Sequence, residues 1–177
     1  MKDLEPKIIK VETGSQFIDD LKMVYMRQFP VHERVSLDPF FEPSIKGADA
    51  WIMTEGNDVL GFVTVLNLSD VTYIFYLATD IRHQGKGVGS QLVNFVKKQY
   101  QPALLFLDCE VPLEEEPDKL QVRLKRTNFY KRLGFKKVGR SNIWRGEHFQ
   151  TMAIGSWMEE KANKLWEHFG PLWKNED

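Results

Sequence analysis

Three glycines at alternate positions, Gly85, Gly87 and Gly89, form the clearest chemical signature in this sequence. They follow an apolar segment, residues 71–78, and precede an amphipathic segment, residues 88–98, so the pattern predicts a strand, a tight turn and a helix N-terminus. Glycine adopts positive φ easily and lets a ligand approach the backbone closely. Free N–H groups at such a turn, together with the helix dipole, favour an anion. The stretch is therefore a candidate phosphate or pyrophosphate site.

Two common nucleotide motifs do not match this stretch. A P-loop needs Ser or Thr directly after its Gly-Lys pair, whereas Lys86 is followed by Gly87. The dinucleotide fingerprint G-x-G-x-x-G is replaced by G-x-G-x-G, and no acidic residue closes a second strand about 20 residues further on. A nucleotide-binding protein that uses the same loop is therefore disfavoured, although it stays open as one hypothesis.

Three motifs together point to a family. Arg82, Gly85 and Gly87 fill the pattern Q/R-x-x-G-x-G/A, and this stretch resembles the GNAT superfamily of acetyl-CoA-dependent N-acyltransferases. Residues 128–135, N-F-Y-K-R-L-G-F, are similar to the family's second signature, a helix ending in Tyr-x-x-x-Gly-Phe. Residues 29–34, F-P-V-H-E-R, resemble the Phe-Pro-x-x-Glu-Arg stretch of many members. The motifs occur in the family's order, with an apolar strand between the first two signatures.

The elements that must position these motifs form a mixed α/β pattern. The expected order is β-α-α-β-β-β-α-β-α-β-β, with a right-handed helical crossover between parallel strands at residues 71–78 and 104–111. Simple alternation in the first of these strands puts Tyr73 on one face and Tyr76 on the other. The resemblance implies a mostly antiparallel sheet whose central parallel pair splays apart around the cofactor, with flanking helices. The remaining expected strands are 8–11, 51–54, 59–66, 135–138 and 150–154.

Composition restricts the broad class of protein. The chain has 177 residues, 42% hydrophobic and 28% charged, with a net charge of −1, which is typical of one globular domain. Neither nucleic acid nor a membrane is an expected partner, because there is no excess of positive charge and no long apolar run. The single cysteine, Cys109, fits a reducing cytoplasm. No metal site is expected, because the His residues are scattered and no second Cys is present.

The expected division is an acyltransferase domain, residues 1–155, followed by an amphipathic helix in residues 156–177. Ser156 and Glu159 have the spacing of a capping box. Three tryptophans lie along this tail. The helix therefore either packs on its own domain or, if the tryptophans are exposed, forms the interface of a homodimer.

The resemblance implies that acetyl-CoA is the co-substrate, although a larger acyl chain stays open. Backbone N–H groups of the glycine-rich turn would hold its pyrophosphate, and the end of the preceding strand would pair with its pantetheine arm. The expected cofactor-binding residues are Leu77, Ala78, Thr79, Arg82, Gln84, Gly85, Lys86, Gly87, Val88, Gly89, Ser90, Asn128 and Tyr130.

Acyl transfer to a primary amine also needs an acid and a base. Tyr130 matches the position of the family's frequent general acid, which protonates the departing thiolate. Two carboxylates, Glu110 and Glu33, are equal candidates for the base that deprotonates the amine. Cys109 falls on an apolar strand face, so direct attack by the amine is favoured over an acyl-enzyme. The alternative function is a non-catalytic acyl-CoA-binding sensor.

Overall fold

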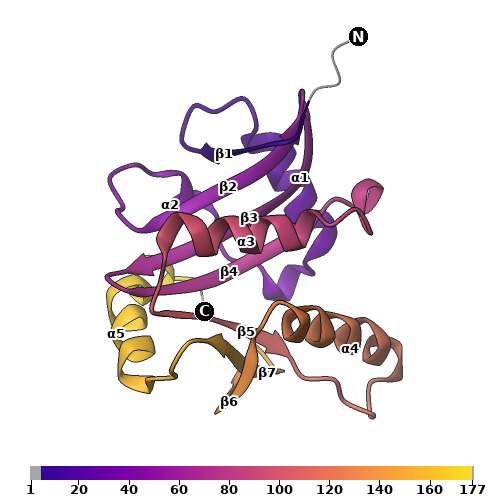
Figure 1. Ribbon diagram of the computed structural model, residues 1–177, viewed down its shortest axis with the longest axis vertical. Helices are drawn as coiled ribbons and strands as arrows, with labels where there is room; N and C mark the ends of the chain where they lie inside the picture. Colours follow the sequence, from indigo (N-terminus) through magenta and orange to yellow (C-terminus); the bar gives the residue numbers. More distant parts are fainter. Residues whose placement is uncertain (1–4, 177) are drawn as a thin grey trace.

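The computed structural model describes residues 5–176 and contains a seven-stranded sheet covered by helices on both faces (Figure 1). The strand order is β1-β2-β3-β4-β5-β7-β6, and all neighbouring pairs are antiparallel except β4 and β5. The predicted fold class is therefore confirmed. The strands are β1 (Lys7–Val11), β2 (Ala48–Glu55), β3 (Asp58–Leu68), β4 (Val71–Thr79), β5 (Leu104–Glu110), β6 (Lys136–Trp144) and β7 (Glu147–Ile154).

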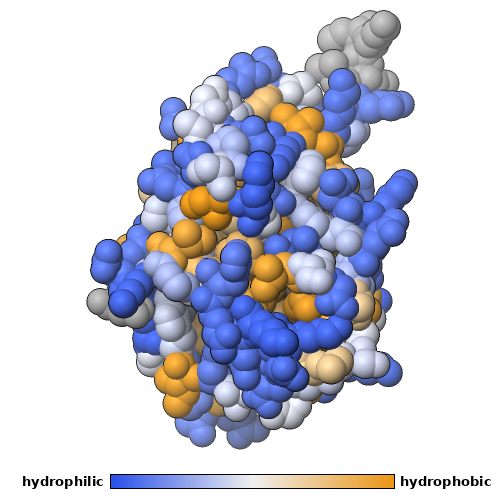
Figure 2. Space-filling model, turned by 90° about the vertical axis from the view of Figure 1, so that its left-hand side faces the viewer, coloured by the Kyte–Doolittle hydropathy of each residue, from blue (hydrophilic) through white to orange (hydrophobic). Residues whose placement is uncertain are grey.

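Two hydrophobic cores, one on each face of the sheet, hold the helices in place. Helices α1, α2 and α5 bury apolar side chains on one face, and α3 and α4 on the other. The outer surface is mixed: on the face shown in Figure 2, hydrophobic side chains form separate patches between hydrophilic ones. No helix in the described part of the chain is both long enough and apolar enough to cross a membrane. The helices are α1 (Ile18–Gln28), α2 (Asp38–Phe41), α3 (Val88–Tyr100), α4 (Pro117–Arg132) and α5 (Glu159–Phe169).

Strand β4 contains a β-bulge that the sequence pattern did not predict. Its pairing with β3 shifts register between Thr64 and Val65, which leaves Phe75 as the extra residue. A one-residue bulge moves every following side chain to the opposite face. The expectation that Tyr73 and Tyr76 face opposite sides is therefore wrong, because both belong to the core under α1 and α5.

The parallel pair at the centre of the sheet is short. Strands β4 and β5 are paired only where Val71–Tyr73 meets Leu104–Phe106. Beyond these residues the strands separate, and a cavity of about 420 Å³ is lined by both. The expected splay of the central pair is thus present.

The tail packs on the same chain. Leu165 and Phe169 of α5 are fully buried, and Trp173 beyond it is 8% exposed and donates a hydrogen bond from Nε1 to the Ser36 carbonyl (2.9 Å). The expected capping box is not formed, because α5 begins at Glu159 and no side chain caps it. The tail therefore contributes its apolar face to the core beneath β4.

Candidate active site

The glycine-rich turn before α3 presents a series of free peptide N–H groups. Gly85 and Gly87 both have φ of +79°, and Gly87 caps the helix in the left-handed conformation. The first N–H of the helix with a backbone acceptor is that of Gln91, which donates to the Gly87 carbonyl (3.0 Å). Within the described residues, the N–H groups of residues 84–90 form no hydrogen bond. Such a turn at a helix N-terminus fits a phosphate or pyrophosphate.

The glycines of this turn have different structural roles. A Cβ on Gly85 would meet no atom within 4 Å, so the space outside this glycine is open to a ligand. A Cβ on Gly89 would instead lie 3.1 Å from Cζ of Phe129 on α4. Gly89 therefore permits close packing of α3 and α4, while Gly85 and Gly87 set the path of the turn.

The basic side chains of the turn are engaged with carboxylates or with each other. The Arg82 guanidinium contacts Asp58 (2.8 Å) and Asp80 (3.1 Å). Burial alone would raise the pKa of Asp80, but the hydrogen bonds and charge of Arg82 hold that pKa below its ordinary value. Nζ of Lys86 lies 3.3 Å from Nδ1 of His83. Arg82 thus links the turn to the β2–β3 hairpin through Asp58 and to the end of β4 through Asp80, which helps to fix the backbone.

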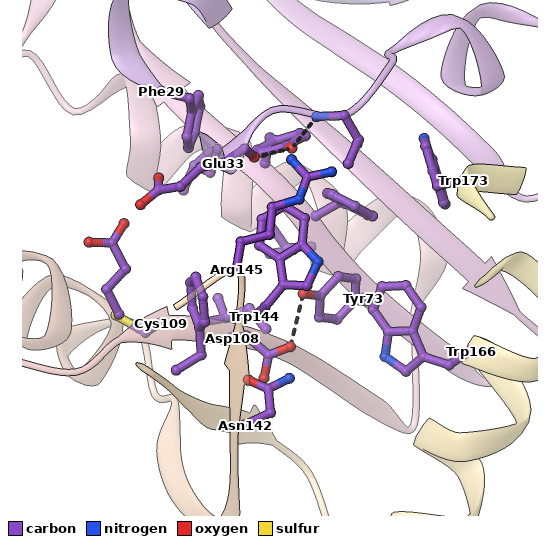
Figure 3. Close-up of a pocket in the computed structure, with 18 of the residues that line it drawn as sticks. Phe29, Glu33, Tyr73, Asp108, Cys109, Asn142, Trp144, Arg145, Trp166 and Trp173 are labelled. Carbon is purple, nitrogen blue, oxygen red and sulfur yellow. Dashed lines mark hydrogen bonds between the residues drawn. The ribbon is translucent and has the colours of Figure 1, made fainter. Parts of the chain in front are cut away.

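The cavity between β4 and β5 joins the two faces of the sheet. Leu77 and Tyr130 line it from the side of α3 and α4, and Glu33 and Asp108 line it from the side of α1. Figure 3 shows Glu33 and Asp108 at separate positions around this space, with Trp144 between them. Ala78 and Thr79 remain paired with β3 on one edge, whereas no strand in residues 5–176 pairs with their other edge. Leu77, at the start of this unpaired edge, lines the cavity, and Ala78 and Thr79 continue the edge beyond it.

Glu33 is held in place by the motif that contains it. The Arg34 guanidinium folds back onto the carbonyls of Phe29 (2.8 Å) and Met26 (2.7 Å) at the end of α1. The Tyr76 hydroxyl, on the bulged strand, donates to the Glu33 carbonyl (2.8 Å). The segment thus has little freedom, and the Glu33 side chain lies in the cavity wall.

The two candidate bases differ in their partners. Burial, followed by the charge of Glu110, raises the pKa of the Glu33 carboxyl to about 7. Among the described residues, the basic side chain within ion-pair distance of it is the neighbouring His32, with Nε2 at 3.9 Å. The Glu110 carboxylate instead forms salt bridges with two arginines: Nε of Arg123 lies at 2.8 Å and a terminal nitrogen of Arg126 at 3.1 Å. Glu33 can therefore accept a proton near neutral pH, whereas both carboxylate oxygens of Glu110 already take part in salt bridges.

Tyr130 lies on the opposite side of the cavity from Glu33. Its ring packs on Phe129 and Phe135, and burial raises the pKa of its hydroxyl. Cys109 faces the same core, and burial also raises the pKa of its thiol, which disfavours a thiolate nucleophile. Asn128, two residues before Tyr130 on α4, is exposed.

Comparison with known proteins agrees with this arrangement. Residues 46–137 match the family model described as "Acetyltransferase (GNAT) domain", which covers more than half of the chain. The protein belongs to the GNAT acetyltransferase family. Over 106 residues it is 29% identical to human N-acetyltransferase 8B, a match that covers 55% of this chain. The chain spans 44% of the length of that human relative.

Solved GNAT structures share the fold of most of this chain. A GNAT-family acetyltransferase from Bacteroides thetaiotaomicron superposes with a TM-score of 0.74 at 18% identity, covering 94% of this chain and 98% of the other. An aminoglycoside 6'-N-acetyltransferase complexed with coenzyme A superposes with a TM-score of 0.64 at 17% identity, covering 84% and 96%. At these identities the comparison shows the fold alone.

Sequence reasoning underestimated the length of β6 and β7, which in this GNAT domain continue beyond the expected strands and form a wall of the cavity. The hairpin turns at Arg145 and Gly146, both with positive φ. The Arg145 guanidinium donates to the carbonyls of His32 (3.2 Å) and Arg34 (2.9 Å), on either side of Glu33. The Arg-Gly pair is a weak marker for this two-residue turn.

A second missed feature is the buried arginine of α4. Arg123 is 2% exposed and contacts Glu110, Glu116 (2.6 Å) and Glu147 (2.9 Å). His32, Glu33 and Glu147 lie close enough to be considered as metal ligands among the described residues. Arg123 and Lys119 already neutralise Glu147, so this group is better explained as part of the ion-pair network.

Proposed function

We propose that this protein transfers an acetyl group from acetyl-CoA to a primary amine, by direct attack of the amine in a ternary complex. The observation that carries the proposal is the splayed cavity, which has Glu33 on one face of the sheet and Tyr130 on the other. An acid and a base on opposite sides of a passage through the sheet suit a reaction in which a nucleophile enters from one side and a thiolate leaves on the other.

Acetyl-CoA would supply the thioester, and the chain would hold it through its backbone. The free N–H groups of residues 84–90 suit the pyrophosphate. The open edge of β4 at Leu77, Ala78 and Thr79 suits the amide groups of the pantetheine arm. Lys86 contributes positive charge beside the turn, and Arg82 holds the turn through Asp58 and Asp80. Asn128, two residues before Tyr130 on α4, is the remaining proposed contact to the cofactor.

Glu33 is the proposed base. An aliphatic amine with a pKa of about 10.4 is mostly protonated at neutral pH, so it must lose a proton before or during attack. A carboxyl whose pKa is about 7 is about half ionised there and is well matched to accept that proton. Glu110 is the weaker candidate, because its oxygens already receive Arg123 and Arg126.

Tyr130 is the proposed acid. As the amine nitrogen bonds to the carbonyl carbon, the carbon–sulfur bond breaks and the sulfur takes up a proton from the Tyr130 hydroxyl. The phenol regains a proton from solvent after the products leave. Burial keeps this hydroxyl protonated at neutral pH, so it is available to donate.

The test is release of CoA thiol from acetyl-CoA in the presence of a panel of amines. Direct attack predicts intersecting initial-velocity lines; parallel lines, together with loss of activity in Cys109→Ala, would indicate an acyl-enzyme instead.

Tyr130→Phe should lower kcat about 10²–10⁴-fold and leave acetyl-CoA affinity unchanged. Tyr100→Phe, which removes a hydroxyl outside the cavity, is the matched control. A non-catalytic sensor would bind acetyl-CoA, release no thiol, and be insensitive to Tyr130→Phe.

A further inference from the structure

Asp108 is a carboxylate on the same side of the cavity as Glu33. The reaction proposed above does not use it. The Tyr73 hydroxyl donates to Oδ2 (3.0 Å) and the Thr151 hydroxyl donates to Oδ1 (2.6 Å). Both donors are neutral, and both lie on the strands that flank β5. Figure 3 shows the Tyr73 bond, with Asn142 next to the carboxylate. The side chain is thus fixed in position, with lone pairs left for another donor.

The charge of Asp108 has no cationic partner among the described residues. Glu110 and Glu147, also near the cavity, are each neutralised by Arg123. Arg140 is the cation on the same wall that could neutralise Asp108. Its guanidinium instead donates to the Asn163 amide oxygen (3.3 Å) and lies 5.9 Å from the ring centroid of Trp157. An ammonium group of a ligand would supply the counter-charge that the described residues do not give this half-buried carboxylate.

Several aromatic rings line the part of the cavity that contains this carboxylate. The Tyr73 ring lies 4.8 Å from Phe106 and 4.9 Å from Trp166, measured between centroids. Trp144 extends from the β6–β7 hairpin into the same space. A carboxylate set among aromatic faces is a favourable environment for an ammonium group, which binds both.

Asp108 and Glu33 are anchored at different points of β4. Asp108 is tied to Tyr73 and the Glu33 segment to Tyr76, and the Phe75 ring lies between them at 5.8 Å and 4.8 Å from the two tyrosine rings. The bulge creates this arrangement by turning both tyrosines to one face. Both carboxylates line the cavity, and the three aromatic rings of β4 form its wall between the two anchoring points.

We propose that Asp108 binds a second ammonium group of the acceptor, so that the acceptor is a small diamine. One amino group lies at Glu33 and is acetylated, and the other remains protonated at Asp108. The aromatic stretch between them takes an apolar spacer. This inference rests on the proposed function, whose acceptor it specifies.

The experiment compares unbranched alkylamines with α,ω-diaminoalkanes of equal chain length. For the wild type, kcat/KM should be about ten- to a hundredfold higher for the best diamine than for its matched monoamine, because a charge-assisted hydrogen bond is gained. Asp108→Asn should abolish this ratio and leave monoamine turnover within about twofold. Equal turnover of both amines by the wild type would overturn the proposal, as would an equal loss for both amines in Asp108→Asn, which indicates a structural role. Preference for a lysine-containing peptide over every diamine would overturn the small-molecule assignment.

Two further variants and a binding assay keep the test independent of folding and of turnover. Tyr73→Phe removes one neutral partner and keeps the charge, so the diamine preference should persist. Asp49→Asn, at another carboxylate that accepts a tyrosine hydroxyl but lies outside the cavity, should have no effect on the ratio. Calorimetric titration of the diamine should show binding that Asp108→Asn removes. Thiol release with monoamines but no diamine binding would overturn this inference alone, whereas diamine binding without thiol release from any amine would count against the proposed function.

Discussion

Replacing Glu33 with glutamine should make the protein more stable at high pH while impairing its reaction. Burial raises the pKa of Glu33 from 4.5 to about 7. The ionised carboxylate is therefore disfavoured in the folded state, and folding loses stability as the pH rises from about 4.5 through about 7. Each pKa unit corresponds to about 1.4 kcal/mol, so the wild type carries a cost of about 3 kcal/mol above pH 7. Glutamine, which is neutral at every pH, carries no such cost.

The assay is thermal unfolding of the wild type and Glu33→Gln at about pH 4 and about pH 8.5. The variant should match the wild type at the lower pH and melt about 6–12 °C higher at the upper pH, because 1 kcal/mol moves Tm by about 2–4 °C in a domain of this size. Its kcat should fall about 10²–10⁴-fold. A variant with the pH dependence of the wild type would refute the assignment of a raised pKa to Glu33.

Glu110→Gln is the matched contrast, because it removes a carboxylate that is already paired. The buried Arg123 would lose one of its three carboxylates, so the variant should be less stable by about 1–3 kcal/mol at neutral pH. The same substitution removes a charge that raises the pKa of Glu33, so the pH–rate profile of kcat/KM should move to lower pH. Stabilisation of both variants at pH 8.5 would contradict the distinction between the two carboxylates.

Two other substitutions test how the turn and the hairpin position the site. Gly87→Ala, at a φ of +79°, should cost about 1–2 kcal/mol in the required conformation and weaken acetyl-CoA binding about five- to thirtyfold by calorimetry. Gly139→Ala, at a glycine with open space and no positive φ, should bind normally, and equal binding by both variants would refute this role of the turn. Arg145→Lys cannot reproduce the contacts to the carbonyls of His32 and Arg34, so amine kcat/KM should fall about tenfold or more while acetyl-CoA affinity is unchanged. An unaltered kcat/KM would show that the hairpin does not position Glu33.

Local patterns predicted the order of the elements and the central parallel pair. The turn before α3 was predictable because glycines and the following apolar periodicity are features of neighbouring residues. The face of Tyr76 was not, because the bulge at Phe75 arises from pairing with β3, a non-local interaction. Alternation alone could not reveal it.

The full length of the β6–β7 hairpin also could not be predicted from local patterns. Strands β6 and β7 were expected to be short, but they continue as a mostly polar hairpin to Trp144 and Glu147. Few buried apolar positions mark such strands, so the sequence carries little period-two signal. Similarly, the sequence made Glu33 and Glu110 equal candidates for the base. Their difference depends on Arg123 and Arg126, which only the packing of α4 against β5 brings to Glu110.

The most direct test of the central claim is a thermal-melting titration with acetyl-CoA, with ATP and NAD in parallel. A ligand at about 100 times its Kd adds about 2.7 kcal/mol to the folded state, which corresponds to a rise in Tm of about 5–11 °C. The account predicts a saturable rise with acetyl-CoA that is absent with the two nucleotides. No rise with acetyl-CoA, or an equal rise with ATP, would contradict the assignment of the turn at residues 84–90 to coenzyme A and the acetyl transfer that depends on it.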